Sequence, residues 1–535
     1  LTGSGTLIKD GQGTMTLNTN NPDFTGNLVV KQGILFGVGQ ADPFGTGYLS
    51  GATVTLGSAD RQGIASFYLG SDNVQGHTLE INHDINVVYN PAQTKRLAFE
   101  TFANGSQIEV NGDITLNDNL QIYINDGAEV GGSQNYVNFN GQFFDGATTS
   151  GNLVLWADDG GSANDNTHGR PYEYFVFRND NSGWTGDVRV NTNISYDQDQ
   201  TAILRLEHAN ALTAANDVDM GYNSMLQVGG GVRAIGSLTT NGGTGPFLGG
   251  NAGGTMGASG NGTTVVIENA ATTAGTLTIN QTTPASTEVQ WNAFFRDGTL
   301  NSEFFAPGAG PTASAALNVV KAGNGWATLT TDNDYTGTTT VTGGILQVGR
   351  GGVGDTGNAL TNGGLTANGG TTIAGSGVIR GNSTINGFLR PGDEAGGSMG
   401  TLIVNGNLTL GATSLASLQV QRSSYTAMNV LSIHDSQYST WNAGHTTDPL
   451  YSHLLNDPLL PTQHDQVRVT GSLTVTSGGK IVLTNSGYNP TAGDVFNFAD
   501  WTGAALSLNL GGISYNGGTF RSGAESGTDL DLFQL

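Results

Sequence analysis

Four oxygen-bearing side chains that lie close together in the sequence could bind a hard cation. Asp158, Asp159, Asn164 and Asp165 supply carboxylate and amide oxygens, which are the ligands that Ca²⁺ prefers. Their order does not match an EF-hand loop, and the chain lacks the Gly-x-Asp nonapeptides of calcium-binding rolls. We therefore treat the four residues as a candidate calcium site, and a plain acidic loop is the alternative.

A histidine-rich stretch further along the chain is a second place where a metal could bind. Half of the eight histidines gather there, and histidine with carboxylate could hold a transition metal. The spacings between them match no compact metal motif, which favours a solvated interaction loop. The residues concerned are His434, His445, His453 and His464, with Asp435, Asp448, Asp457 and Asp465.

Two glycine-rich motifs could do catalytic or cofactor chemistry. Residues 396–400 fit the G-x-S-x-G pattern around Ser398, and residues 349–354 fit the G-x-G-x-x-G pattern. A serine nucleophile and a dinucleotide site both need a helix directly after the motif. Turn residues or a strand follow each motif here, so we interpret both as corners between strands.

A glycan-processing site would need carboxylates combined with basic residues, or two acids at a fixed separation. Asp159, Arg170, Tyr172 and Glu173 could line a groove, although nothing in their spacing requires it. The chain has only 19 Lys and Arg residues, and they are dispersed. We therefore predict a non-enzymatic protein without catalytic residues, and with no cofactor apart from the candidate calcium.

The composition indicates an all-β chain with many turns. Gly contributes 84 of the 535 residues, and charged residues only 12%. Thr and Val favour strands, whereas Gly and Asn favour turns. Because there is no Cys, disulfides and thiol catalysis are excluded. The net charge of −24 opposes binding to nucleic acid, and no stretch approaches the ~20 apolar residues of a membrane helix.

An internal repeat is the strongest sign of how the chain is organised. A Lys-x-Gly-x-Gly turn with a following strand occurs at residues 9–17 and again at residues 321–329. An aromatic-Thr-Gly corner with further strands follows at residues 24–35 and 335–346, and a partial third copy lies at residues 184–190. Short strands between such corners predict a right-handed parallel β-helix, or β-solenoid, of roughly 20–25 residues per coil.

Two long segments interrupt the strand pattern and define the expected domains. We expect residues 1–422 to form the β-solenoid, with a loop region extruded at residues 131–174. A second extruded loop is expected at residues 423–466. Residues 467–535 would form a β-rich segment that continues or caps the solenoid. Loops of this length are usually functional or mobile.

The repeat resembles the autotransporter-associated β-strand repeat, also called the passenger-associated transport repeat. The resemblance rests on residues 321–325, 335–341 and 343–348. Downstream segments are similar to what commonly follows this repeat in secreted bacterial proteins: 375–379, 389–392, 400–406, 465–471 and 488–496. The resemblance implies a protein of the bacterial cell surface or the extracellular space.

Three functions remain open at this point. The chain begins and ends inside strand patterns, which suggests head-to-tail stacking of solenoids into a surface fibre, sheath or matrix. A fragment with missing caps is the alternative reading of the two ends. The second function is an adhesin whose loops contact glycans or other cells, and the third is a polysaccharide-degrading enzyme. We favour the self-assembling structural protein.

Overall fold

The fold is taken from a computed structural model, which describes most of the chain. The described residues are 1–38, 43–70, 78–101, 107–126, 134–158, 172–192, 201–221, 224–240, 265–298, 315–331, 333–349, 359–360, 363–392, 394, 399–420 and 465–485, with the strands named below after residue 494. They form two compact units. The first comprises Leu1–Asn280 and Asn292–Leu317, and the second comprises Gln281–Trp291 and Asn318–Leu535.

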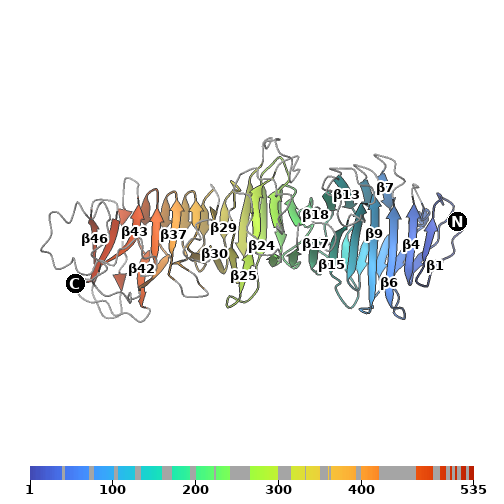
Figure 1. The fold of residues 1–535 in the computed structure, drawn as a ribbon, viewed down its shortest axis with the longest axis horizontal. Helices are drawn as coiled ribbons and strands as arrows, with labels where there is room; N and C mark the ends of the chain where they lie inside the picture. The colour runs from blue at the N-terminus through green and yellow to red at the C-terminus, as the bar shows by residue number, and fades with distance from the viewer. Residues whose placement is uncertain are drawn as a thin grey trace, which may run out of the picture. The chain divides into compact units, whose positions relative to one another are not determined.

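The first unit is built from three long sheets in which neighbouring strands come from successive coils (Figure 1). The first sheet contains β1 (Leu7–Lys9), β3 (Leu28–Val30), β5 (Thr53–Leu56), β8 (Asp84–Val87), β11 (Ile114–Leu116) and β14 (Phe143–Asp145). The second sheet contains β2 (Thr14–Leu17), β4 (Gly33–Val38), β6 (Gly63–Gly70), β9 (Gln93–Thr101), β12 (Leu120–Asp126), β15 (Leu153–Asp158), β17 (Val188–Thr192), β19 (Val218–Met220) and β22 (Leu238–Thr240). The third sheet contains β7 (Thr78–Ile81), β10 (Gln107–Val110), β13 (Gln134–Phe139), β16 (Tyr172–Phe177), β18 (Thr201–Leu206), β20 (Ser224–Val228), β23 (Val265–Asn269) and β26 (Ala293–Asp297). A further pair, β21 (Gly231–Ile235) and β24 (Gly275–Asn280), and one 3₁₀ turn, η1 (Gly47–Ser50), complete the unit.

The second unit repeats this plan, and its strands belong to three sheets. The first contains β27 (Leu317–Ala322), β29 (Thr339–Val341), β32 (Leu365–Ala367), β35 (Ser383–Ile385), β38 (Leu408–Leu410), β41 (Leu473–Val475) and β44 (Ser507–Leu508). The next contains β25 (Glu288–Trp291), β28 (Trp326–Leu329), β30 (Ile345–Val348), β33 (Thr372–Gly375), β36 (Phe388–Pro391), β39 (Leu415–Val420), β42 (Lys480–Asn485) and β45 (Ile513–Ser514). The last contains β31 (Ala359–Leu360), β34 (Val378–Arg380), β37 (Thr401–Asn405), β40 (Gln466–Val469), β43 (Val495–Trp501), β47 (Asp529–Gln534) and β46 (Phe520–Glu525).

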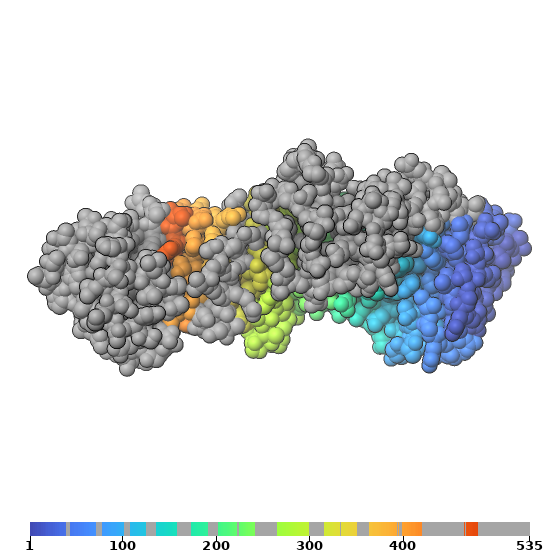
Figure 2. Space-filling model, viewed as in Figure 1, coloured from blue at the N-terminus to red at the C-terminus, as the bar shows by residue number. Residues whose placement is uncertain are grey.

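Parallel register confirms the all-β solenoid. Leu35 of β4 pairs with Phe67 of β6, which pairs with Leu97 of β9, and so on along one inward row. These side chains are fully buried, because successive coils cover one another's inner faces. The expected strands at residues 14–17 and 345–348 are confirmed as β2 and β30. The outer surface of the first coils is blue in Figure 2.

Coils are longer than predicted in much of the first unit. Corner contacts between neighbouring coils join residues 20 apart at Asn318 and Thr338, but 35 apart at Asn152 and Asp187. The two full repeat copies are therefore short coils, and the repeat pattern predicted the length of these coils but not of the longer ones.

The loop region predicted at residues 131–174 is wrong for its described part. Residues 134–158 form β13, β14 and β15, and residues 172–174 begin β16. Their alternating pattern was hidden by polar side chains such as Asn135, Asn138 and Gln142. The predicted loop at residues 423–466 lies outside the described residues apart from its last two positions. The division between units falls near residues 281–317, and not at residues 422 and 466.

The segment after residue 466 both continues the solenoid and changes its pattern. β40 pairs in parallel with β43, as β37 does with β40. β43 then pairs with β47, and β47 with β46, in antiparallel fashion. An antiparallel hairpin therefore lies at the end of this ladder.

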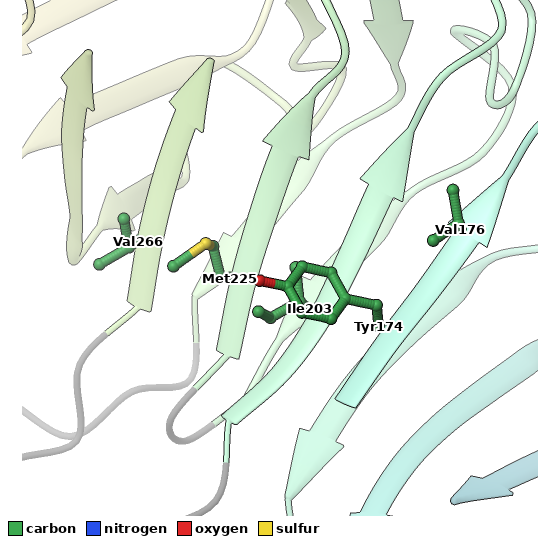
Figure 3. Close-up of a cluster of buried hydrophobic side chains, with 5 residues drawn as sticks. All are labelled: Tyr174, Val176, Ile203, Met225 and Val266. Atoms are coloured by element: carbon green, nitrogen blue, oxygen red, sulfur yellow. The ribbon is translucent and has the colours of Figure 1, made fainter. Parts of the chain in front are cut away.

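In the third sheet of the first unit, both faces are largely buried along β16, β18, β20 and β23. Inward side chains such as Phe175 and Leu204 face the core, and a second apolar cluster lies on the opposite face of the same strands. Figure 3 shows this cluster, in which β16 contributes two side chains and β18, β20 and β23 contribute one each. Its members are Tyr174, Val176, Ile203, Met225 and Val266. This sheet is therefore the best-buried layer of the unit.

Polar side chains at the corners join each coil to the next. The side-chain oxygen of Asn119 accepts the backbone N–H of Asn152 at 3.0 Å. The side-chain oxygen of Asn152 in turn accepts the backbone N–H of Asp187 at 2.9 Å. Asp187 and Asp217 continue the series to Ser237. Every acceptor takes its donor from the following coil, so the ladder has a direction. Such bonds satisfy corner N–H groups that no strand partner reaches.

Candidate functional site

Of the four residues of the predicted calcium site, only Asp158 lies within the described residues. Asp158 ends β15, where only its backbone is described. Asp159, Asn164 and Asp165 lie outside the described residues, so the site stays a prediction. Within the part of the chain that the structure describes, no group of three or more His, Asp or Glu side chains could hold a metal ion.

The other motif residues lie mostly beyond the described ranges. Ser398 lies outside them, as do residues 350–354 and the histidines of the 423–466 segment. Strand β37 directly follows the G-x-S-x-G motif, as predicted. Glu173, proposed for an open groove, is instead fully buried, and Asn135 Nδ2 donates to its Oε1 at 3.0 Å. The groove prediction is therefore wrong for Glu173. No helix among the described residues has the length and hydrophobicity of a membrane span.

Each repeat copy buries one lysine at a corner between strands. In the second copy, Lys321 Nζ donates to the carbonyl oxygens of Gly323 at 2.8 Å, Gly325 at 2.5 Å and Gly343 at 2.7 Å. The side chain is fully buried, and burial lowers the pKa of Lys321 to about 8. Gly343 belongs to the following coil, so one ammonium group ties two coils together.

The first copy contains the same arrangement around Lys9. Its Nζ donates to the carbonyl oxygens of Gly11 at 2.5 Å and Gln32 at 3.0 Å. Gly33 has a φ of 81°, and a Cβ there would lie 2.5 Å from Lys9 Nζ. Gly344, with a φ of 64°, stands in the same relation to Lys321 Nζ. The Lys-x-Gly-x-Gly turn and the later glycine are therefore two halves of one lysine-binding corner.

The aromatic-Thr-Gly corners are structural as well. Phe24, Trp184 and Tyr335 are all buried. Trp184 Nε1 donates to the Gly151 carbonyl oxygen at 2.9 Å. Each aromatic ring fills the inside of its corner, which explains why the motif recurs in three copies.

A cavity in the second unit is the best candidate for a binding site. It has a volume of about 300 Å³, and it lies on the outward side of β36 and β39. Register brings its walls together, because Phe388 pairs with Leu415 and Leu389 with Ala416. The lining residues are Arg390, Pro391, Gly392, Glu394, Ser417, Gln419 and Asp465.

Asp465 is the most deeply buried polar group of this cavity. Its carboxylate accepts the N–H of Gly400 at 3.0 Å and that of Gln419 at 2.7 Å. Burial raises the pKa of Asp465 to about 7, although the two N–H groups favour the carboxylate form. Backbone groups thus fix the orientation of an acid that titrates near neutral pH.

A second acid and its cationic partner lie at the cavity wall. Arg390 Nη1 lies 2.5 Å from Glu394 Oε1, and their side chains are 43% and 18% exposed. The Glu394 N–H donates to Gln347 Oε1 at 3.1 Å. The Arg390 guanidinium also stacks over the Phe388 ring, 5.5 Å from its centroid. Both charged side chains are therefore held in place while part of each stays accessible.

Sequence reasoning did not predict this cavity. Arg390 and Asp465 each lie in a segment that is similar to what commonly follows the repeat in secreted bacterial proteins, yet nothing in the sequence showed that the two segments meet. Residues 421–464 separate the two segments in the sequence, so their spacing along the chain carried no information on their distance in space. The signal that could have found them is a charged residue at a strand end in each segment.

Comparison with known families gives one finding. The passenger-associated-transport-repeat model matches residues 7–35 and 319–348. These two segments contain the two lysine corners and the aromatic corners at Phe24 and Tyr335. No curated protein matches the chain.

Proposed function

Because the chain carries the passenger-associated transport repeat, a family associated with the secreted or surface-exposed passenger domains of autotransporters, we propose that it is a non-enzymatic structural protein outside the cell. Its solenoid would be the subunit of a surface fibre, sheath or matrix, formed by stacking of end coils. The proposal assigns no catalytic role to any residue.

One observation carries the proposal: in the first unit, one series of corner contacts joins successive coils in a single direction. The corner ladder from Asn119 to Ser237 takes every donor from the following coil. A contact between the last coil of one subunit and the first coil of another would use groups of the same kind, corner side-chain oxygens and backbone N–H groups. Such a heterologous contact does not close on itself and so builds a filament.

The edge of β1 gives a direct test of stacking. β1 pairs with β3 on one side, and Leu7 N–H and Lys9 C=O are used in that pairing. The N–H of Ile8 between them points to the opposite edge. Ile8→Pro would remove that donor and leave the β1–β3 ladder intact, whereas Ile8→Thr keeps it.

Negative-stain microscopy and sedimentation over a concentration series measure the result. We expect filaments from the parent chain and from Ile8→Thr, and only short species from Ile8→Pro. Monomers at every concentration, with circular dichroism showing an intact fold, would rule the stacking proposal out. Filaments from all three proteins would show that β1 is not the stacking edge.

A second function, that of a monomeric adhesin, is favoured by the antiparallel hairpin. β47 and β46 end the last ladder of the second unit with a pairing that no parallel coil can continue. We therefore also consider a passenger that displays its excursions to glycans or to other cells. Deleting residues 421–464 should abolish cell adhesion in this case while thermal unfolding of both units stays unchanged.

A further inference from the structure

We propose that the cavity of the second unit binds a single sugar ring, one monosaccharide unit of a surface glycan. The inference goes beyond the structural function, and it holds whether or not the solenoid polymerises. It rests on the residues that line the cavity and on how their polar groups are held.

Polar groups of both kinds converge on the cavity. The Arg390 guanidinium offers N–H donors beyond the one that Glu394 accepts. Glu394 and Asp465 offer acceptor lone pairs, and Ser417 and Gln419 offer both donors and acceptors. A ring with neighbouring hydroxyl groups needs this mixture, because each hydroxyl donates one bond and accepts others.

Fixed orientation distinguishes this cavity from a loose acidic surface. Two backbone N–H groups, from Gly400 and Gln419, hold the Asp465 carboxylate. Arg390 is held by Glu394 and by the Phe388 ring. Groups that are already oriented lose little entropy when a ligand binds. The carboxylate can therefore accept hydroxyl donors without rearrangement.

The charges exclude other ligand classes. A phosphate or sulfate would face two carboxylates, and a metal ion would face the Arg390 guanidinium. Pro391 is the only hydrophobic side chain in the described lining, so a lipid tail would bury polar groups without partners. The volume of about 300 Å³ lies at the lower end of ligand pockets, which suits one ring rather than an extended chain.

Protonation of Asp465 should weaken the binding. The charged groups that line the cavity with it are Arg390 and Glu394. Burial raises the pKa of Asp465 to about 7, so the group loses acceptor capacity as the pH falls below that value. The affinity for a sugar should therefore be higher at pH 8 than at pH 5.5.

Saturation-transfer NMR with the whole chain tests the proposal. The probes are the methyl glycosides of glucose, galactose, mannose and N-acetylglucosamine, each titrated to tens of millimolar, with sodium sulfate as the anion control. We expect saturation transfer from the protein to at least one glycoside. Adding sulfate should not reduce this signal. The matched variants are Arg390→Gln in the cavity and Arg380→Gln on β34, which removes the same charge from a residue outside the described lining.

Arg390→Gln should raise the dissociation constant about tenfold or more, because a charged hydrogen bond is lost. Arg380→Gln should leave it unchanged. A second variant, Ser417→Ala, makes a small change that keeps the fold and should also weaken binding. No transfer from any glycoside, displacement by sulfate, or equal binding by all variants would overturn the proposal. Filament formation is measured separately, so failure here leaves the structural function untouched.

Discussion

Replacing the buried lysine of the second repeat is the sharpest test of how the coils are held together. Lys321→Met keeps the length and the apolar stem of the side chain but removes the ammonium. The carbonyl oxygens of Gly323, Gly325 and Gly343 lie 2.5–2.8 Å from Nζ. Those of Gly323 and Gly343 then lose this donor, whereas that of Gly325 keeps the Ile345 N–H at 3.1 Å. Gly323 and Gly325 belong to the turn of the lysine itself, and Gly343 belongs to the next coil.

The size of the effect follows from these contacts. A buried acceptor without a partner costs about 1–3 kcal/mol, and two acceptors are left without this donor. Part of this cost is offset, because the variant no longer buries a charge, an effect that also lowers the pKa of Lys321. We expect the free energy of unfolding of the second unit to fall by about 3 kcal/mol.

Lys31→Met is the matched control. Lys31 lies in the first repeat copy, only partly buried, and its substitution should change stability by less than about 0.5 kcal/mol. Urea unfolding followed by hydrogen exchange and mass spectrometry reports each unit separately, with peptides over residues 321–345 as the local probe. If Lys321→Met and Lys31→Met lose the same stability, the ammonium is not what holds the corner.

Three further predictions address other features. In urea titrations, Gly344→Ala should destabilise the second unit by about 2 kcal/mol more than Gly370→Ala does. Both glycines have a positive φ, but only at Gly344 would an added Cβ meet other atoms, 2.2 Å from Gly325 O. Equal losses of stability would show that φ alone matters. The stability of the second unit should fall from about pH 4 to pH 7, because Asp465 keeps its proton up to about 7 when folded but releases it near 3.8 when unfolded. The folded state binds more protons in that window, the total is on the order of 4 kcal/mol, and Asp465→Asn should flatten the curve. Trp184→Phe should cost about 2 kcal/mol in thermal unfolding of the first unit, since the Gly151 carbonyl oxygen loses its donor; a neutral result would refute that role.

The repeat pattern alone was enough to predict the architecture. The strand at residues 14–17 and the corner glycine Gly33 follow from alternation and from turn chemistry, and the structure contains both. What the pattern could not show is why lysine begins each copy. Lys9 looks like an exposed charge in the sequence, yet its ammonium is held by carbonyl oxygens of two coils. A buried cation that is paired only with backbone leaves no partner to recognise in the sequence.

The cavity was harder to predict than the fold for a physical reason. The parallel pairing of β36 and β39 sets Arg390 beside Ser417, and the return of the chain from residue 464 adds Asp465 to them. Register between distant strands depends on the whole coil and not on local spacing. The same limit explains the error at residues 134–158, where polar side chains hid strands that the neighbouring coils stabilise.

The closed base of the 421–464 excursion makes the second unit a natural platform for grafting. The Asp465 N–H donates to the Gln419 carbonyl oxygen at 2.9 Å, so the chain leaves and re-enters the coil at nearly one point. Leu408 still pairs with Leu473 across the excursion, and the parallel ladder runs through without a break. A folded module whose own termini lie close together could therefore replace residues 421–464 without straining the coil.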